Sequence, residues 1–273
     1  MPFSKDVLTG ASGNQGSAGF YAYQIENSCR FTLTHADRLT RTPSSAGNRR
    51  TNTFSMWVKR QPYLETYQTL FLQSDDASTT NRTSSINFQT EDNGTGALGR
   101  IYSAINGGLE GALNTVGRFK DTTSWFHLVL RTDTTQGTEA NRQRLYINGQ
   151  LQTFESSPSY PSQNFETGYC NTTELVIGSN ANANSDYPFS GYLAEVILAD
   201  GTSYGPDQFG ESKGGVWIPK DPSGTTFGTT GFHLKFGDAS SLGADSSGQG
   251  NNFSVNSIGS DHQEITSPTN GTG

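Results

Sequence analysis

The sequence has little charge, little cysteine and no long apolar run. Charged residues make up 16% of the 273 residues and hydrophobic residues 32%, both below the averages for globular domains, whereas 32 glycines are present. Aromatic residues at 11% and a net charge of only −7 exclude a disordered chain. No apolar run approaches the ~18 residues of a membrane span. Residues 1–20 lack the basic start and apolar core of a secretory signal. This composition is typical of a turn-rich β protein with a neutral polar surface.

Charge and cysteine also limit the partners. Cys29 and Cys170 are the only cysteines, and their spacing matches no metal or redox motif, so we expect two buried thiols. The net charge argues against nucleic acid as a partner, because phosphate neutralisation needs clustered cations. Up to residue 60, eight Lys and Arg stand against three Asp and Glu, and the remaining chain carries −12. A basic edge that faces an acidic partner is one reading of this asymmetry, and a solvated edge is the other.

Short strand signals follow one another along the chain. Residues 53–59 alternate between apolar and polar positions, and residues 125–131 are apolar on both faces, which predicts a central strand. Asn148-Gly149 predicts a type I′ hairpin turn, and residues 105–108 give a similar signal. No window of a dozen residues keeps a helical period. We predict an all-β, two-sheet jelly-roll sandwich.

Composition divides the chain into three parts. Residues 1–20 are rich in Gly and Ser and form a flexible or docking N-terminal arm. Residues 21–239 form the jelly roll, including a surface excursion at 202–228 that contains three prolines. Residues 240–273 are a C-terminal segment rich in Ser, Gly and Asn.

Catalytic motifs are missing from the sequence. It contains no phosphate-binding loop, no HExxH zinc signature and no Gly-x-Ser-x-Gly nucleophile turn. Glycoside hydrolysis needs two carboxylates across the sugar. Glu195 stands alone in its strand, and we expect it to be exposed or to pair with a neighbouring strand. His127 and His233 lie in apolar strands and fit structural roles. The sequence predicts a protein that is not an enzyme.

Two loop regions offer binding residues. Sugar binding combines aromatic rings with Asn, Asp or backbone groups, and the candidate residues for it are Tyr160, Tyr169, Asn182, Asn184 and Tyr187. The oxygen ligands that calcium prefers occur at Asn182, Asn184 and Asp186. Asn and Asp also dominate loops for conformational reasons, so no cofactor is assigned and calcium is left open.

The ordered strands resemble the concanavalin A-like, laminin G-like jelly roll. The segments that carry this resemblance are 54–59 (FSMWVK), 125–130 (WFHLVL), 144–149 (RLYING) and 191–197 (GYLAEVI). Their order and spacing cover roughly residues 29–199. The family's calcium ligands have no residue-by-residue match in this chain.

A second resemblance is narrower. The chain is similar to structural proteins of marine tailed bacteriophages in the segments 39–50 (LTRTPSSAGNRR), 200–202, 209–211, 215–220 (GVWIPK) and 242–253 (LGADSSGQGNNF). Similar phage proteins often continue past a segment like 265–271, where this chain stops.

The second resemblance implies a function. It implies a virion surface protein, as head decoration or fibre component, that is assembled in the host cytoplasm and adheres to host-surface glycans. Its partners would be other virion proteins and further copies of itself, with no nucleic acid and no membrane span. The alternatives are a bacterial carbohydrate-binding adhesin module and, less favoured, a glycan hydrolase.

Overall fold

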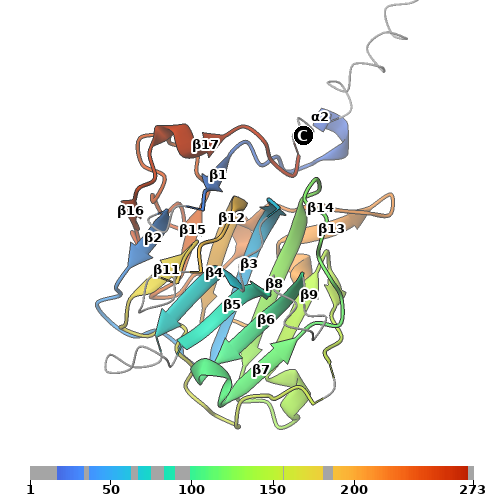
Figure 1. Cartoon of the computed structure of the whole chain (residues 1–273), viewed down its shortest axis with the longest axis vertical. Coiled ribbons are helices and arrows are strands. Elements are labelled where there is room, and N and C mark those ends of the chain that lie inside the picture. The colour runs from blue at the N-terminus through green and yellow to red at the C-terminus, as the bar shows by residue number, and fades with distance from the viewer. Residues whose placement is uncertain are drawn as a thin grey trace, which may run out of the picture.

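The computed structural model confirms the all-β prediction, with 42% strand and 8% helix. It describes residues 17–33, 37–62, 67–74, 83–89, 99–155, 157–180 and 187–269. In these residues two large antiparallel sheets pack face to face as a sandwich (Figure 1). No helix within the described ranges has the length and apolarity needed to cross a membrane.

The strand predicted to be central, at residues 125–131, lies inside the first sheet and is paired on both sides. Its order is β10-β9-β8-β3-β12-β1-β17, and β15 also pairs with β12. The register sets Trp57 of β3 between His127 of β8 and Ala194 of β12. The strands are β1 (Ser28–Phe31), β3 (Thr51–Arg60), β8 (Phe126–Asp133), β9 (Gln143–Ile147), β10 (Gln150–Leu151), β12 (Gly191–Asp200), β15 (Phe232–Leu234) and β17 (Gln263–Glu264).

The second sheet is built mainly from the first half of the chain. Its order is β16-β2-β11-β4-β5-β6-β7. The strands are β2 (Arg38–Arg41), β4 (Tyr67–Ser74), β5 (Thr83–Gln89), β6 (Arg100–Ile105), β7 (Gly111–Asn114), β11 (Leu175–Ile177) and β16 (Ser254–Asn256). The short helices of the described chain are α2 (Ser17–Phe20), η1 (Asn106–Gly108), η2 (Glu139–Asn141), η3 (Pro206–Gln208), η4 (Pro222–Gly224) and η5 (Ser260–His262).

The core lies between the two sheets. Phe54, Met56 and Val58 point inward from β3, as their alternation predicts, and all three are fully buried. The Phe54 ring lies 3.9 Å from that of Phe71 in β4 and 5.1 Å from that of Tyr169, measured between centroids. Cys29 and Cys170 are buried free thiols, as expected.

The excursion at 202–228 forms a third layer on the outer face of the first sheet. It contains a hairpin of β13 (Gly210–Lys213) and β14 (Val216–Pro219). Phe209 packs on Val129 and Ile197, and Trp217 packs near Trp57. Both faces of β3, β8 and β12 are therefore covered. For this reason, residues on either face of these strands can be apolar.

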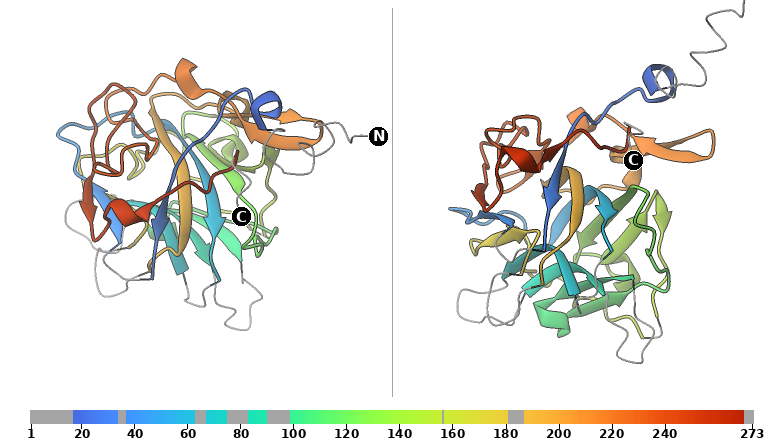
Figure 2. Two further views of the ribbon diagram at one scale, coloured as in Figure 1. Left: turned by 90° about the horizontal axis from the view of Figure 1, so that it is seen from above. Right: turned by 45° about the horizontal axis from the view of Figure 1, so that its top comes forward.

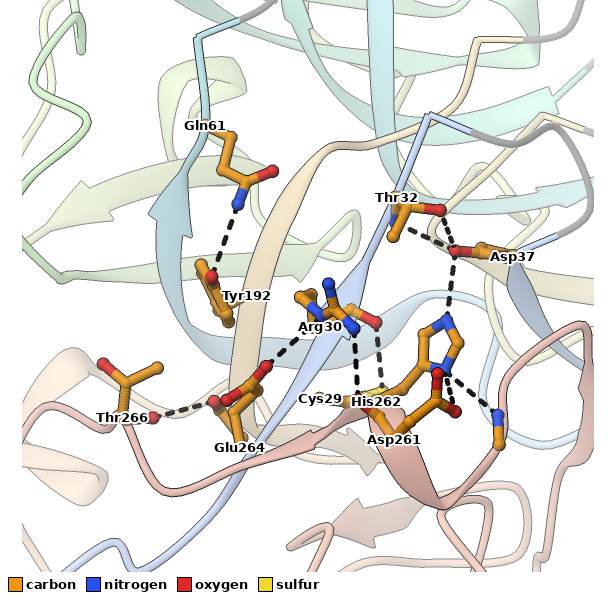
Figure 3. Close-up of polar contacts among 12 residues, drawn as sticks. Cys29, Arg30, Thr32, Asp37, Gln61, Tyr192, Asp261, His262, Glu264 and Thr266 are labelled. Atoms are coloured by element: carbon orange, nitrogen blue, oxygen red, sulfur yellow. Dashed lines mark hydrogen bonds and ion pairs between the residues drawn. The ribbon is translucent and has the colours of Figure 1, made fainter.

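The described ends of the chain run together. β17 pairs with β1, and Thr269 Oγ1 both accepts a hydrogen bond from Ile25 N–H and donates one to Ile25 C=O, each 2.9 Å long. Arg30 pairs with Glu264 at 3.3 Å, as Figure 3 shows. Nearby, α2 lies beside the β13–β14 hairpin (Figure 2), where Lys213 Nζ donates to the Phe20 carbonyl at 2.6 Å.

The Gly- and Asn-rich segment at 242–253 is an anchored loop. The Asp245 carboxylate accepts hydrogen bonds from the N–H groups of His233, Ser247 and Asn251 at 2.8 to 2.9 Å. Asn251 in turn donates to the Gly231 carbonyl at 2.7 Å. Because backbone donors occupy the Asp245 oxygens, this segment ties the C-terminal part to β15.

Candidate functional site

Three half-buried tyrosines contact one another on the outer face of the second sheet. Tyr67 begins β4, and Tyr102 lies in β6 with its ring centroid 6.3 Å from that of Tyr67. Tyr187 precedes β12, and its ring meets Tyr67 edge-on at 5.3 Å. The Tyr187 carbonyl accepts a hydrogen bond from Thr69 N–H at 3.0 Å, which fixes this segment beside β4. We call Tyr67, Tyr102 and Tyr187 the tyrosine row.

Strand alternation places the row on the outer face. Phe88 and Ile101 are fully buried in the core and pair with each other, so the next residues along β5 and β6, Gln89 and Tyr102, point outward. The register pairs Tyr67 with Gln89 across β4 and β5, and Tyr102 with Asn87 across β5 and β6. Side chains from three strands are thereby neighbours.

Amide side chains surround the row. Gln89 Nε2 donates to the Tyr67 hydroxyl at 3.4 Å. Thr69 donates to Asn87 Oδ1 at 2.9 Å. Asn114 of β7 lies opposite Tyr102. Among the described residues, the Gln89 Oε1 and Asn114 Oδ1 atoms have no hydrogen-bond partner. These described side chains are neutral and polar, and Arg100, which lies opposite Gln89, adds a charged neighbour.

The hydroxyl of Tyr102 is held close to a turn. A Cβ on Gly108, which has a φ of +90°, would lie 2.9 Å from this oxygen, so glycine leaves the room that the hydroxyl needs. Burial, with a smaller contribution from Tyr67, raises the pKa of Tyr102. The hydroxyl therefore stays protonated at neutral pH and can donate a hydrogen bond.

The structure separates the residues predicted to bind sugar. Tyr187 lies in the row. Tyr160 lies elsewhere, in a groove of about 270 Å³ that Arg144, Leu151 and Phe154 also line. The prediction for Tyr169 is wrong, because this side chain is fully buried against Phe54 and Phe71 and cannot reach a ligand.

The predicted calcium ligands lie outside the described residues. Asn182, Asn184 and Asp186 precede Tyr187 in the sequence, and their calcium and sugar roles remain predictions. Within the described ranges, no group of three or more His, Cys, Asp or Glu side chains is arranged to hold a metal ion.

Glu195 is buried and pairs with a histidine of the neighbouring strand. Its carboxylate lies 2.5 Å from His233 Nε2 of β15, so the expected pairing with a neighbouring strand is confirmed and the alternative of exposure is wrong. Glu195 has a φ of +48° at a register shift in β12, and this bulge turns it toward a small pocket under the third layer. Tyr23 lines the same pocket, and burial together with Glu195 raises the pKa of its hydroxyl. Tyr23 and His233 thus share one buried carboxylate.

Ser55 and His127 are close together but not arranged for nucleophilic catalysis. Trp217 Nε1–H donates to His127 Nδ1 at 3.0 Å, so the proton of the neutral ring is on Nε2 and points at Ser55 Oγ, 2.8 Å away. Burial lowers the pKa of His127 to about 3. A protonated Nε2 cannot take a proton from the serine. The hydrogen bonds among Ser55, His127 and Trp217 therefore have a structural role, and they join the first sheet to the third layer.

The sequence interpretation did not include Tyr67 and Tyr102. Tyr102 could have been predicted. Ile101 and Ile105 follow the alternation of a half-buried strand, and this pattern places Tyr102 on the outer face. Tyr67 gave no such signal, since a bulge between Thr69 and Phe71 reverses the alternation of β4.

Comparison with protein families gives a match that covers more than half of the chain. The model of the concanavalin A-like lectin/glucanases superfamily matches residues 34–202. A comparison with curated proteins gives no match.

Solved structures similar to this chain come from different organisms. A proposed carbohydrate-binding protein from Bacteroides ovatus has a TM-score of 0.60 at 13% identity, covering 86% of this chain and 59% of its own. This chain therefore spans about three fifths of that protein. The heptameric SAP-like pentraxin of Limulus polyphemus has a TM-score of 0.43 at 17% identity, covering 68% of this chain and 82% of its own. Domains LG4-5 of the mouse laminin α1 chain have a TM-score of 0.44 at 9% identity, covering 78% of this chain and 48% of theirs.

Proposed function

Since the chain belongs to the concanavalin A-like lectin/glucanases superfamily, we propose that it binds glycans without cleaving them and that the tyrosine row is its binding surface. The observation that carries this proposal is the contact of Tyr67 with both Tyr102 and Tyr187 on an outer sheet face. The similarity to a proposed carbohydrate-binding protein of Bacteroides ovatus agrees with it.

The row has the chemistry that a sugar ring requires. Tyrosine offers a flat apolar face for the C–H groups of a pyranose and a hydroxyl for its polar edge. The Gln89 Oε1 and Asn114 Oδ1 atoms beside the row are buried, so the groups of the row that can bond to sugar hydroxyls are the tyrosine hydroxyls. A small number of polar groups beside aromatic rings is typical of a small-molecule or oligosaccharide site.

The carboxylates support a role without catalysis. A glycosidase holds two of them about 5 to 10 Å apart across the scissile bond. In the described chain Glu195 is engaged by His233, on the sheet that does not carry the row. Among the described residues, the row and the amides of Gln89 and Asn114 beside it carry no carboxylate.

We expect the protein to be displayed on a phage particle. The support is the resemblance of segments 39–50, 215–220 and 242–253 to structural proteins of marine tailed bacteriophages. A decoration or fibre protein would contact other virion proteins and further copies of itself at the virion surface, and would reach host glycans there. A bacterial adhesin module is the alternative, and it shares the same proposed glycan site.

Replacing Tyr67 with alanine should weaken glycan binding about tenfold or more, because Tyr67 contacts both other rings of the row. Binding is measured on a glycan array and then by titration calorimetry. The matched control is Tyr160→Ala, a half-buried tyrosine in the separate groove, which should bind as the unmodified protein does. If Tyr160→Ala loses binding and Tyr67→Ala keeps it, the site is the groove and not the row.

Deleting residues 2–16 should abolish incorporation into the particle while the thermal midpoint stays unchanged. This segment has few apolar side chains to pack on its own domain, and a Gly- and Ser-rich arm can become ordered on a partner. Occupancy is measured by electron microscopy of particles assembled with the truncated chain. Full occupancy would contradict attachment through the arm and would point to the 202–228 layer instead.

A further inference from the structure

Glu155 lies on the outer face of the second sheet, in line with Tyr102. The segment that contains it continues the sheet beyond β7: Thr115 and Phe154 form an isolated bridge, and Glu155 N–H donates to the Asn114 carbonyl at 2.9 Å. Asn114 in turn pairs with Tyr102 in register. Because Phe154 packs against the core, the next side chain, Glu155, points outward. Tyr102, Asn114 and Glu155 therefore form one cross-strand line on the face that carries the tyrosine row.

Arg100 draws the Glu155 carboxylate toward the row. Arg100 and Tyr102 are alternate residues of β6 and share its outer face. Arg100 Nη1 forms an ion pair with Glu155 Oε1, and the two side chains are 8% and 42% exposed, respectively. Arg100 is also in register with Gln89, whose amide donates to the Tyr67 hydroxyl at 3.4 Å. The carboxylate thus reaches across β7 to the strand of Tyr102 and remains open to solvent.

This carboxylate supplies a group that the row lacks, a charged hydrogen-bond acceptor. An ionised carboxylate accepts hydrogen bonds at both oxygens, and such bonds are about twice as strong as those between neutral groups. Arg100 engages Oε1, which leaves Oε2 to accept from the hydroxyl groups of a sugar. A single carboxylate held by an arginine does not form the pair that glycoside hydrolysis needs.

We propose that Glu155 accepts a hydrogen bond from a hydroxyl of the glycan bound by the row, and that this glycan is neutral. The inference rests on the glycan-binding function proposed above and adds the class of ligand. Arg100 is the positioning residue, because it holds the carboxylate beside Tyr102. An acidic sugar unit at this place would meet the negative charge of Glu155 while Arg100 is already engaged, and like charges brought together in an interface disfavour binding.

The test is an array of tetrasaccharides of glucose, galactose, mannose and glucuronic acid, with analogues in which a single hydroxyl is replaced by hydrogen. One deoxy analogue of the neutral glycan that binds should bind the unmodified protein about tenfold or more weakly, as titration calorimetry measures. Glu155→Gln should lose most of this difference, since a neutral amide is a weaker acceptor. The matched control is Glu166→Gln, which changes a glutamate that is 52% exposed and paired with Arg50 at 3.0 Å, and it should keep the difference.

The outcomes separate this inference from the proposed function. If Glu155→Gln keeps the full difference, or if the unmodified protein binds only the glucuronic acid probes, the role of Glu155 is overturned and glycan binding stands. Binding of no glycan would overturn both proposals. If Glu155→Gln does not fold because Arg100 stays buried without its partner, the double variant Arg100→Gln/Glu155→Gln removes both charges and should lose the same difference. The comparison of neutral with acidic probes needs no variant and decides in every case.

Discussion

Replacing Trp57 with alanine should lower the free energy of unfolding by about 3 to 5 kcal/mol. The Trp57 ring is 4% exposed on the outer face of β3, and it stacks on His127 at 4.8 Å. Trp217 of the third layer donates a hydrogen bond from Nε1 to Nδ1 of the same imidazole at 3.0 Å. Alanine would leave a cavity between the first sheet and the layer that covers it, and urea unfolding measures the loss.

The control for this prediction is Trp125→Ala. Trp125 packs against the same cluster but is only partly buried, so its loss should cost about 1 to 2 kcal/mol. Equal effects of the two substitutions, or an effect of Trp57→Ala below about 1 kcal/mol, would show that the 202–228 layer does not pack on the sheet as described.

Replacing His233 with leucine should cost about 3 to 5 kcal/mol, because it leaves the Glu195 carboxylate buried without its partner. The two side chains are 4% and 6% exposed and lie 2.5 Å apart. The Tyr23 hydroxyl would still bond to Glu195. The measurement is again the unfolding free energy in urea at neutral pH.

A second substitution tests why His233→Leu lowers the free energy of unfolding. Combining His233→Leu with Glu195→Gln removes the buried charge, so the double variant should be more stable than His233→Leu alone. If the double variant is the less stable of the two, the loss comes from packing of the imidazole on the Phe227 ring, with centroids 6.1 Å apart, and the hydrogen bond to Glu195 is not the reason.

Strand positions and hairpins could be predicted from local patterns. Phe54, Met56 and Val58 alternate, and the structure buries all three between the sheets. Asn148 and Gly149 have φ values of +48° and +76° in the tight turn between β9 and β10, as the Asn-Gly pair predicts. Both signals depend on a few neighbouring residues, so they can be read from the sequence alone.

The candidate site depends on contacts between distant segments. Tyr67, Tyr102 and Tyr187 meet only because the second sheet brings β4, β5 and β6 into register and because the Tyr187 segment bonds to Thr69. The segment around Tyr169 has the composition of a loop, but it enters the core. There the Tyr169 hydroxyl donates a hydrogen bond to the Ser85 carbonyl at 3.3 Å. Burial of a loop aromatic is a property of the packed sandwich, and local pattern gives no sign of it.

The central claim, that the tyrosine row binds glycan, is tested most directly by nuclear magnetic resonance of the protein with isotope-labelled tyrosine rings. The ligand is the glycan that binds most strongly on the array. Its addition should shift the ring signals of Tyr67, Tyr102 and Tyr187. The signals of Tyr160 and of Tyr146, which lies in β9 and packs against Val129, Ile197 and Phe209, should stay unchanged. Shifts confined to Tyr160, or shifts that miss all three rings of the row, would contradict the claim.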